Sequence, residues 1–184
     1  MYPYIRAALA VLRAKRDPAK SILTTAATDH RAWPWDTDMY GELNNGRILT
    51  LGELGRWGLA REIGLLGALK RRSGALAIAG VSVRYRRRIP VMARYRIETR
   101  ALGWDAKFIY LDVSMWMGET AANQALLRTA VVTKNGTVPP AEIAAELGHD
   151  APSPPLPDWV HAWIDAEARR PWPPISVLAI DSAV

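Results

Sequence analysis

The chain contains no cysteine among its 184 residues. Disulfides, thiolate nucleophiles and cysteine-ligated metal sites are therefore excluded, and the composition suits a reducing compartment. The three histidines, His30, His149 and His161, are scattered along the chain and lack the spacing of metal ligands. We expect neither a metal nor another cofactor.

Long apolar runs are also missing. No stretch approaches the roughly 20 consecutive apolar residues of a transmembrane helix, and the N-terminus lacks the pattern of a cleaved signal peptide. These absences favour a cytoplasmic protein. With 49% hydrophobic residues, the chain can still bury the core of one domain with extensions, whereas a second full domain is not expected.

Acidic residues are outnumbered, because 24 Lys and Arg accompany 18 Asp and Glu, which gives a formal net charge of +6. A basic protein attracts nucleic acid, an acidic membrane surface or a phosphorylated small molecule, and a simple solvated surface explains the same charge. The sequence shows neither zinc-finger spacing nor the aromatic motif of an RNA-binding sheet. Nucleic acid is therefore not an expected partner.

Residues 4–15 have the apolar spacing of a short helix, with Ile5, Leu9 and Leu12 on one face. We expect this helix to dock on the domain. A basic amphipathic helix can instead lie on a membrane surface, so a basic peripheral membrane protein is an alternative. Liposome flotation with and without residues 1–16 tests it.

A long buried helix is predicted over residues 48–69, because apolar residues recur there at three- to five-residue intervals. Gly52, Gly55 and Gly58 lie three residues apart within it. Each glycine costs about 1 kcal/mol relative to Ala in a helix interior. The glycine stripe therefore predicts that another backbone approaches this helix closely.

The remaining pattern is mainly that of strands. A first strand is expected within residues 28–35, and apolar and polar residues alternate after residue 74. This alternation predicts four antiparallel strands, within residues 81–86, 93–100, 109–115 and 127–133. One strand, a long helix and four strands form an α+β order. A short helix over residues 139–148 and a later helix capped by Asp158 complete the chain.

The most informative motif runs from Asp38 to Leu49 and reads Asp-Met-Tyr-Gly-Glu-Leu-Asn-Asn-Gly-Arg-Ile-Leu. It resembles the Asp-x-Asn-Gly-His-Val-Asn-Asn-x-Arg-Tyr-Leu signature of hotdog-fold acyl-CoA thioesterases of the 4-hydroxybenzoyl-CoA thioesterase type. The matching residues are Asp38, Gly41, Asn44, Asn45, Arg47 and Leu49. The departures are Tyr40, Glu42, Leu43 and Ile48. Glu42 stands where the signature has a histidine, which removes a group that assists proton transfer in some relatives.

The resemblance implies a hotdog fold, in which an antiparallel sheet wraps around a long central helix. On this interpretation residues 1–26 form an N-terminal helical extension, residues 27–137 the thioesterase domain, and residues 138–184 a proline-rich C-terminal extension with short helices. The resemblance also implies a homodimer or a dimer of dimers. Strands of two subunits would join edge to edge, with the pocket at their interface.

The same resemblance implies hydrolysis of an acyl-CoA or acyl-carrier thioester. In the family the position of Asp38 carries the catalytic carboxylate, which either attacks the thioester carbonyl or activates a water. Backbone amides of Asn45 and Gly46 are expected to hold the oxyanion, with Asn44 as a substrate contact or as an ordinary N-cap. Glu53 is a second catalytic candidate, because another branch of hotdog thioesterases places a Glu similarly on the central helix.

Basic residues near the end of the first predicted strand after the helix are candidates for binding substrate phosphates. They are Arg84, Arg86, Arg87 and Arg88. Guanidinium groups bind phosphate through bidentate contacts, although a charge run is often simply a solvated face. Asp36, two residues before Asp38, is expected to be structural and to hold the loop.

Two further functions come from other classes. A non-catalytic acyl-thioester-binding hotdog protein would keep the pocket and lose turnover, and the departure at Glu42 favours it. A hotdog hydratase would need a His and Asp pair at the helix entrance, where none of the histidines lies.

Overall fold

The computed structural model describes residues 2–174. The chain falls into two compact units, Met1–Pro154 and Pro155–Val184. Each unit is described by itself.

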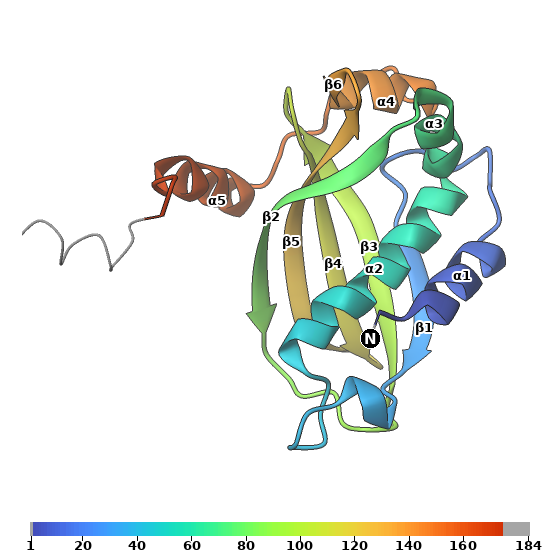
Figure 1. Ribbon diagram of the computed structural model, residues 1–184, viewed down its shortest axis with the longest axis vertical. Coiled ribbons are helices and arrows are strands. Elements are labelled where there is room, and N and C mark those ends of the chain that lie inside the picture. Colours follow the sequence, from blue (N-terminus) through green and yellow to red (C-terminus); the bar gives the residue numbers. More distant parts are fainter. Residues whose placement is uncertain (1, 175–184) are drawn as a thin grey trace, which may run out of the picture. The chain divides into compact units, whose positions relative to one another are not determined.

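The larger unit is a curled antiparallel sheet with helix α2 (Asn45–Glu62) lying across its concave face (Figure 1). The strands are β1 (Ala26–Arg31), β2 (Ala75–Tyr85), β3 (Arg94–Trp104), β4 (Ile109–Met117), β5 (Thr120–Thr133) and β6 (Gly136–Val138). Their order is β1-β3-β4-β5-β2, and β6 pairs with β5. All pairs are antiparallel, as the alternation predicted.

The prediction of one helix over residues 48–69 was wrong. Two helices occupy this region, α2 and α3 (Leu65–Arg72). They are separated at Gly64, whose φ of +84° lies in the left-handed region that glycine adopts without strain. The apolar pattern continues across the break, because Ile63 and Leu65 pack in the same buried cluster.

Strand bounds also differ from the sequence prediction. β1 ends before Pro34, which begins a short 3-10 helix, Pro34–Asp36. Proline has no backbone N–H for the sheet and so ends the strand. β6 was not predicted, because three residues are too few to show an alternation.

Among the three glycines of the stripe, Gly55 leaves the least room for a side chain between α2 and the sheet. A Cβ there would lie 2.5 Å from Oγ1 of Thr99 and 2.7 Å from Cγ2 of Ile97, both in β3. A Cβ added at Gly52 or Gly58 would lie 3.4 or 3.5 Å from the nearest sheet atom, which is an ordinary contact distance. The expected close approach therefore occurs at one glycine of the stripe, and the atoms that approach belong to side chains instead of backbone.

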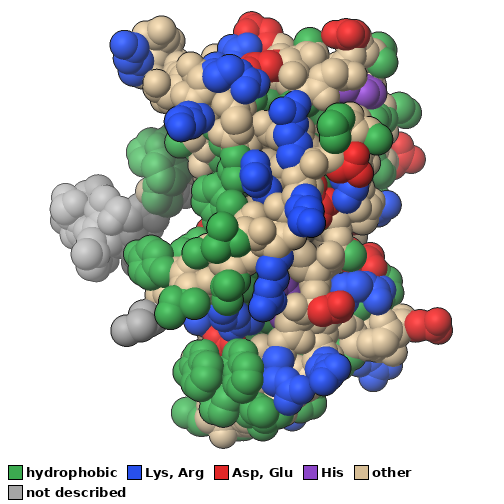
Figure 2. Space-filling model, turned by 90° about the vertical axis from the view of Figure 1, so that its right-hand side faces the viewer, with side chains coloured by type: hydrophobic (Ala, Val, Ile, Leu, Met, Phe, Trp, Pro, Cys, Tyr) green, Lys and Arg blue, Asp and Glu red, His purple; other side chains and the backbone are tan. Residues whose placement is uncertain are grey.

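The N-terminal helix α1 (Tyr4–Arg13) lies beside α2 (Figure 1). Ala7 and Ala10 pack against the main core cluster, so the helix docks on the domain as predicted, but not through the predicted apolar face. On the other side of the helix Ile5 and Leu12 are 79% and 77% exposed. The side of the molecule that carries α1 shows many Lys and Arg side chains, with hydrophobic side chains gathered at its lower end (Figure 2). Within residues 2–174, no helix combines the length and apolarity needed to cross a membrane.

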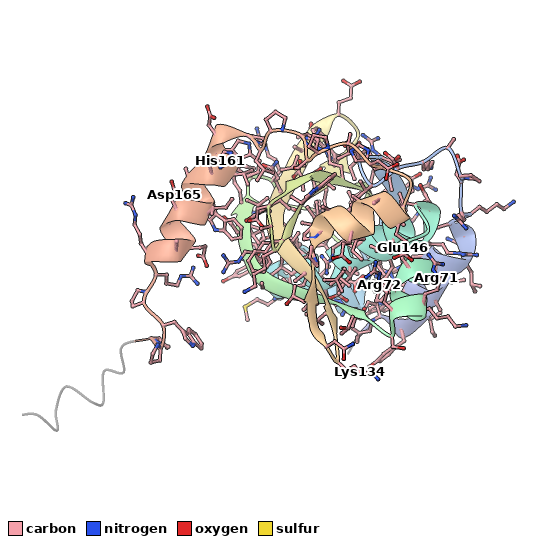
Figure 3. The ribbon with its side chains drawn as sticks, turned by 90° about the horizontal axis from the view of Figure 1, so that it is seen from above. Arg71, Arg72, Lys134, Glu146, His161 and Asp165 are labelled. Atoms are coloured by element: carbon pink, nitrogen blue, oxygen red, sulfur yellow. The ribbon has the colours of Figure 1, made fainter. Side chains whose placement is uncertain are left out.

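Helix α4 (Pro140–Glu146) confirms the predicted short helix and is joined to α3 by ion pairs. Glu146 lies 2.7 Å from both Arg71 and Arg72 (Figure 3). The hydrogen bond from Arg72, with further contribution from Arg71, lowers the pKa of the Glu146 carboxyl. This cluster fixes the end of the unit opposite the motif loop.

The smaller unit contains α5 (Asp158–Arg169). The predicted capping role of Asp158 was wrong, because Pro157 occupies the N-cap position and no side chain caps the helix. Asp158 is instead the first helical residue, where a negative charge suits the helix dipole. His161 and Asp165 follow on the same helix, one turn apart (Figure 3). Part of the predicted C-terminal extension, residues 175–184, lies outside the described residues.

Candidate active site

The loop that carries Asp38 is a small closed hairpin between the 3-10 helix and α2. Thr37 pairs with Leu43, and the backbone N–H of Asp38 donates to the carbonyl of Glu42 at 2.9 Å. Gly41 makes the turn with a φ of +70°. Asp38 is half-buried and its Oδ1 accepts the backbone N–H of Tyr40 at 2.9 Å. Its Oδ2 accepts no hydrogen bond from any described residue, so this carboxylate oxygen is available to a substrate or a water.

Asp36 holds this loop against the start of α2. Its side chain is fully buried, and Oδ1 lies 2.7 Å from Nε of Arg47 in the first turn of the helix. Arg6 of α1 forms the second ion pair with the same carboxylate and also donates to the hydroxyl of Tyr95. A buried carboxylate is stable only when such partners compensate it. The interpretation of Asp36 as the structural acid of the pair therefore agrees with its contacts.

The first turn of α2 is capped by its own sequence. Oδ1 of Asn44 accepts the backbone N–H groups of Gly46 at 2.9 Å and of Arg47 at 3.2 Å. The N–H of Asn44 donates to the carbonyl of Asp36 at 3.1 Å. Within the described chain, the backbone N–H of Asn45 is therefore the one main-chain donor of residues 44–47 without an acceptor. Asn44 serves as the N-cap, and Gly46 uses its amide within the protein.

Tyr85, at the end of β2, contacts this helix start. Its hydroxyl donates to the carbonyl of Asn45 at 3.2 Å. Asn123 of β5 lies opposite Tyr85 in the sheet register and opposite Met115 on its other side. Nδ2 of Asn123 is buried and has no hydrogen-bond partner among the described residues. Asn123 could not be predicted from the sequence, because a single Asn within an alternating strand gives no signal of its own.

Glu53 lies on α2 but has other partners. The hydroxyl of Tyr2 donates to its Oε2 at 2.5 Å, and Arg56 forms an ion pair at 3.2 Å. Burial and the hydrogen bond to Glu53 raise the pKa of the Tyr2 hydroxyl. In the described structure no hydrogen bond joins Glu53 to the Asp38 loop. The two catalytic candidates are thus separate: Asp38 lies at the helix start, and Glu53 lies under the N-terminal segment.

The four predicted phosphate-binding arginines divide into three environments. Arg84 and Arg86 line a hollow on the sheet, and Arg87 is exposed. Nε of Arg88 lies 3.0 Å from Oε2 of Glu42, without the alignment of a hydrogen bond. Glu42, which replaces the signature histidine, is therefore held by an arginine from the adjacent turn.

The surroundings of Asp36 also affect two titratable groups. His30 stacks on Tyr95 with ring centroids 5.7 Å apart, and its Nε2 lies 2.8 Å from Oγ1 of Thr28. Burial, assisted by the positive charge of Arg6, lowers the pKa of His30 to about 4. Burial raises the pKa of Tyr95 to about 12. Both side chains are therefore neutral near pH 7, beside the charged Asp36 cluster.

No group of three or more His, Cys, Asp or Glu side chains suitable for a metal occurs in residues 2–174. The chemistry available at the site consists of a carboxylate and a backbone donor at a helix N-terminus.

Comparison with known proteins agrees with this arrangement. The model of the thioesterase-like superfamily matches residues 32–164, which include the Asp38 loop, α2 and strands β2 to β6. The chain belongs to this superfamily. It is 32% identical to Protein THEM6 of Xenopus laevis over 110 residues, which cover 59% of this chain and 53% of that protein. It is 29% identical to Protein THEM6 of Drosophila melanogaster over 132 residues, covering 71% and 67%. The chain thus spans about half to two thirds of the length of these relatives.

Solved thioesterase structures share the fold. A probable thioesterase from Escherichia coli superposes with a TM-score of 0.62 at 16% identity, covering 67% of this chain and 96% of that chain. A 1,4-dihydroxy-2-naphthoyl-CoA thioesterase from Synechocystis gives 0.58 at 12% identity, covering 67% and 95%. At these identities the likeness establishes the hotdog fold, as the motif predicted.

Proposed function

We propose that the chain hydrolyses an acyl-CoA or acyl-carrier thioester to a free acid and a thiol, with Asp38 as the catalytic carboxylate. The observation that carries the proposal is that two adjoining segments, the Asp38 loop and the first turn of α2, each carry an unused group. Oδ2 of Asp38 and the N–H of Asn45 both lack partners in the described structure, and Asp36 ties the Asp38 loop to the helix turn that begins at Asn45.

The two groups match the needs of thioester cleavage. The N–H of Asn45, aided by the dipole of α2, donates to the thioester oxygen and stabilises the negative charge that develops there. Asp38 either attacks the carbonyl carbon or removes a proton from the attacking water. The carbon–sulfur bond then breaks, and the departing thiolate takes up a proton. Both routes consume one water and give the same products.

A homodimer belongs to the same proposal. The edge strand β2 pairs with β5 on one side only, and an uncovered strand edge is a ready surface for pairing with another chain. Edge-to-edge pairing of two β2 strands would place the partner chain beside Tyr85 and the start of α2. The substrate pocket would then be completed by the second subunit.

The second candidate function is an acyl-thioester-binding protein without turnover. The contact between Glu42 and Arg88 favours it, because the residue in the histidine position is already engaged in an ion pair. The two functions differ only in whether a bound thioester is cleaved.

The test is thiol release from short, long and aromatic acyl-CoAs by the wild type and four variants. We expect Asp38→Asn to lose about 10²–10⁴-fold in kcat. Asn45→Pro removes the N–H, and proline is favoured at the first helical position after an extended residue such as Asn44. We expect kcat of Asn45→Pro to fall about 10²-fold, as it does when one oxyanion donor is removed. Asn45→Ala keeps the N–H and should keep most of the activity.

Glu53→Gln is the control for a carboxylate on the same helix. We expect it to retain turnover, because Glu53 is engaged by Tyr2 and Arg56. Loss of turnover with Glu53→Gln alone would move the chemistry away from Asp38. A folded wild type that binds acyl-CoA but releases no thiol from any substrate would favour the binding protein.

A further inference from the structure

A hollow of about 580 Å³ lies on the sheet. The register aligns four of its lining residues in one row across four strands: Arg84, Gln124, Ser114 and Glu98. Val83, the neighbour of Arg84, packs against the core on the side of α2. Since successive strand residues point to opposite faces, the row of Arg84 opens on the face away from α2. The hollow is therefore separate from the groups around Asp38.

The acidic side chains of the hollow are already neutralised. Asp112 is 5% exposed, lies 3.0 Å from Nη2 of Arg100 and accepts a hydrogen bond from Nε2 of Gln124 at 3.0 Å. Glu98 lies 2.8 Å from Nη2 of Arg96. These pairs form a fixed polar floor and do not cancel the remaining positive charge.

That remaining charge comes from Arg84 and Arg86, which are exposed and have no acidic partner among the described residues. They lie two apart on β2 and line the same hollow. Trp116 lines it as well, and its Nε1 donates to Oγ of Ser114 at 2.8 Å, which fixes the indole ring. Two unpaired guanidinium groups and one aromatic ring are the groups that recognise phosphate and a planar base.

We propose that this hollow binds the phosphorylated nucleoside end of a coenzyme A thioester, with Arg84 and Arg86 on the phosphates and Trp116 on the adenine. The proposal rests on the proposed function, since it identifies the thiol carrier of that substrate. The volume lies within the range of small-molecule sites, about 300–1,000 Å³. Two of the four predicted arginines, Arg84 and Arg86, line the hollow, and Trp116 lines it without having been singled out by any sequence pattern.

The position of Tyr85 connects the hollow with the catalytic end. Tyr85 lies between Arg84 and Arg86, and its hydroxyl reaches the carbonyl of Asn45 on the opposite face of the strand. The end of β2 is therefore all that separates the phosphate-binding arginines from the start of α2. Coenzyme A carries its thioester on a long flexible arm, which can pass around the end of this strand.

The test measures binding of adenosine 3′,5′-bisphosphate, which contains the nucleoside and 3′-phosphate of coenzyme A and cannot be hydrolysed as a thioester. Calorimetry compares the full-length wild type with Arg84→Gln, Arg86→Gln and Arg87→Gln, each of which removes one positive charge. We expect Arg84→Gln and Arg86→Gln each to weaken binding about fivefold or more. Arg87→Gln is the matched control, because Arg87 does not line the hollow, and should change binding less than about twofold.

Several outcomes would overturn the proposal. Equal losses in all three variants would mean a general charge effect, and tighter binding of ADP than of the 3′,5′-bisphosphate would point to a free nucleotide instead. A wild type that binds neither nucleotide but forms a tetramer through this face would assign the hollow to a second pair of chains.

The Asp38→Asn variant separates this proposal from the catalytic one. If the wild type and Asp38→Asn both bind the nucleotide but neither cleaves a thioester, only the proposed hydrolysis is contradicted. If the wild type cleaves thioesters but does not bind the nucleotide, only the proposed nucleotide site is contradicted.

Discussion

Individual residues of this site take their roles from their neighbours. Asp36 and Asp38 are two residues apart and have the same chemistry, but Asp36 is fully buried between Arg6 and Arg47, whereas Asp38 keeps one oxygen free at the surface of the loop. Each oxygen of the Asp36 carboxylate is already engaged by a guanidinium group, so neither is free to contact a substrate or a water. Asp36 therefore positions the loop, and Asp38 is left to act.

His30 provides a test of the burial beside this cluster. Its pKa in the folded protein is about 4, below the ordinary value of 6.5, because burial disfavours the charged ring. Between pH 6.5 and 4, His30 binds a proton in the unfolded chain but stays neutral in the folded protein. The free energy of unfolding should therefore fall with decreasing pH between about 6.5 and 4, by at most about 1.4 kcal/mol per pH unit for this group.

The measurement is urea unfolding of the wild type and His30→Phe at pH 7.5, 6.0 and 5.0. Phenylalanine can keep the stacking on Tyr95 and has no proton to gain, so the difference between the two curves isolates His30 from the other titrating groups. Stability of the wild type should fall faster than that of the variant. Parallel losses in both proteins would show that His30 is not buried in the neutral form.

At the scale of elements, the strands, the α+β order and the N-cap at Asn44 could be predicted, because alternation, capping and the motif are local patterns. The break at Gly64 could not, since apolar positions continue in register with the core on both sides of it. The partners of Asp36 and Glu53 were also invisible. Arg6 and Tyr2 belong to the N-terminal segment and reach these acids only through the docking of α1. Such long-range contacts leave no trace in sequence spacing.

The glycine stripe of α2 makes a prediction at this scale. Gly55→Ala places a methyl group 2.5 Å from Oγ1 of Thr99 and should destabilise the protein by about 1–3 kcal/mol, as overpacking does. Gly58→Ala meets Cγ2 of Thr28 at 3.5 Å, an ordinary contact. It should gain stability of up to about 1 kcal/mol from helix propensity.

Thermal unfolding of the two variants beside the wild type checks this pair. Because both changes add the same methyl group to the same helix, the difference between them reports the packing against β3 alone. Equal effects of the two substitutions would mean that α2 does not approach the sheet more closely at Gly55.

At the scale of the whole molecule, strand β2 lies at an edge of the sheet and pairs with β5 on one side only in the described structure. Ile78 and Val81 on this strand are 45% and 40% exposed, and an edge strand with exposed apolar side chains favours pairing with a second copy. In a twofold-symmetric pair each subunit presents the same strand, so a charge placed on β2 faces the same charge on the partner. The activity of Asp38 and Asn45, which lie beside the end of β2, would then depend on dimer formation, although both residues belong to one chain.

The last prediction follows from this symmetry. The double variant Ile78→Lys and Val81→Lys should convert a dimer into a monomer, measured by light scattering after gel filtration. It should also lower turnover, because the partner strand would no longer complete the pocket beside Tyr85. Leu12→Lys adds a lysine at an exposed apolar position of α1 and should change neither mass nor turnover. A wild type that elutes at the 20.4 kDa of one chain while hydrolysing thioesters would contradict the dimer. The site around Asp38 and Asn45 would then be complete within a single subunit.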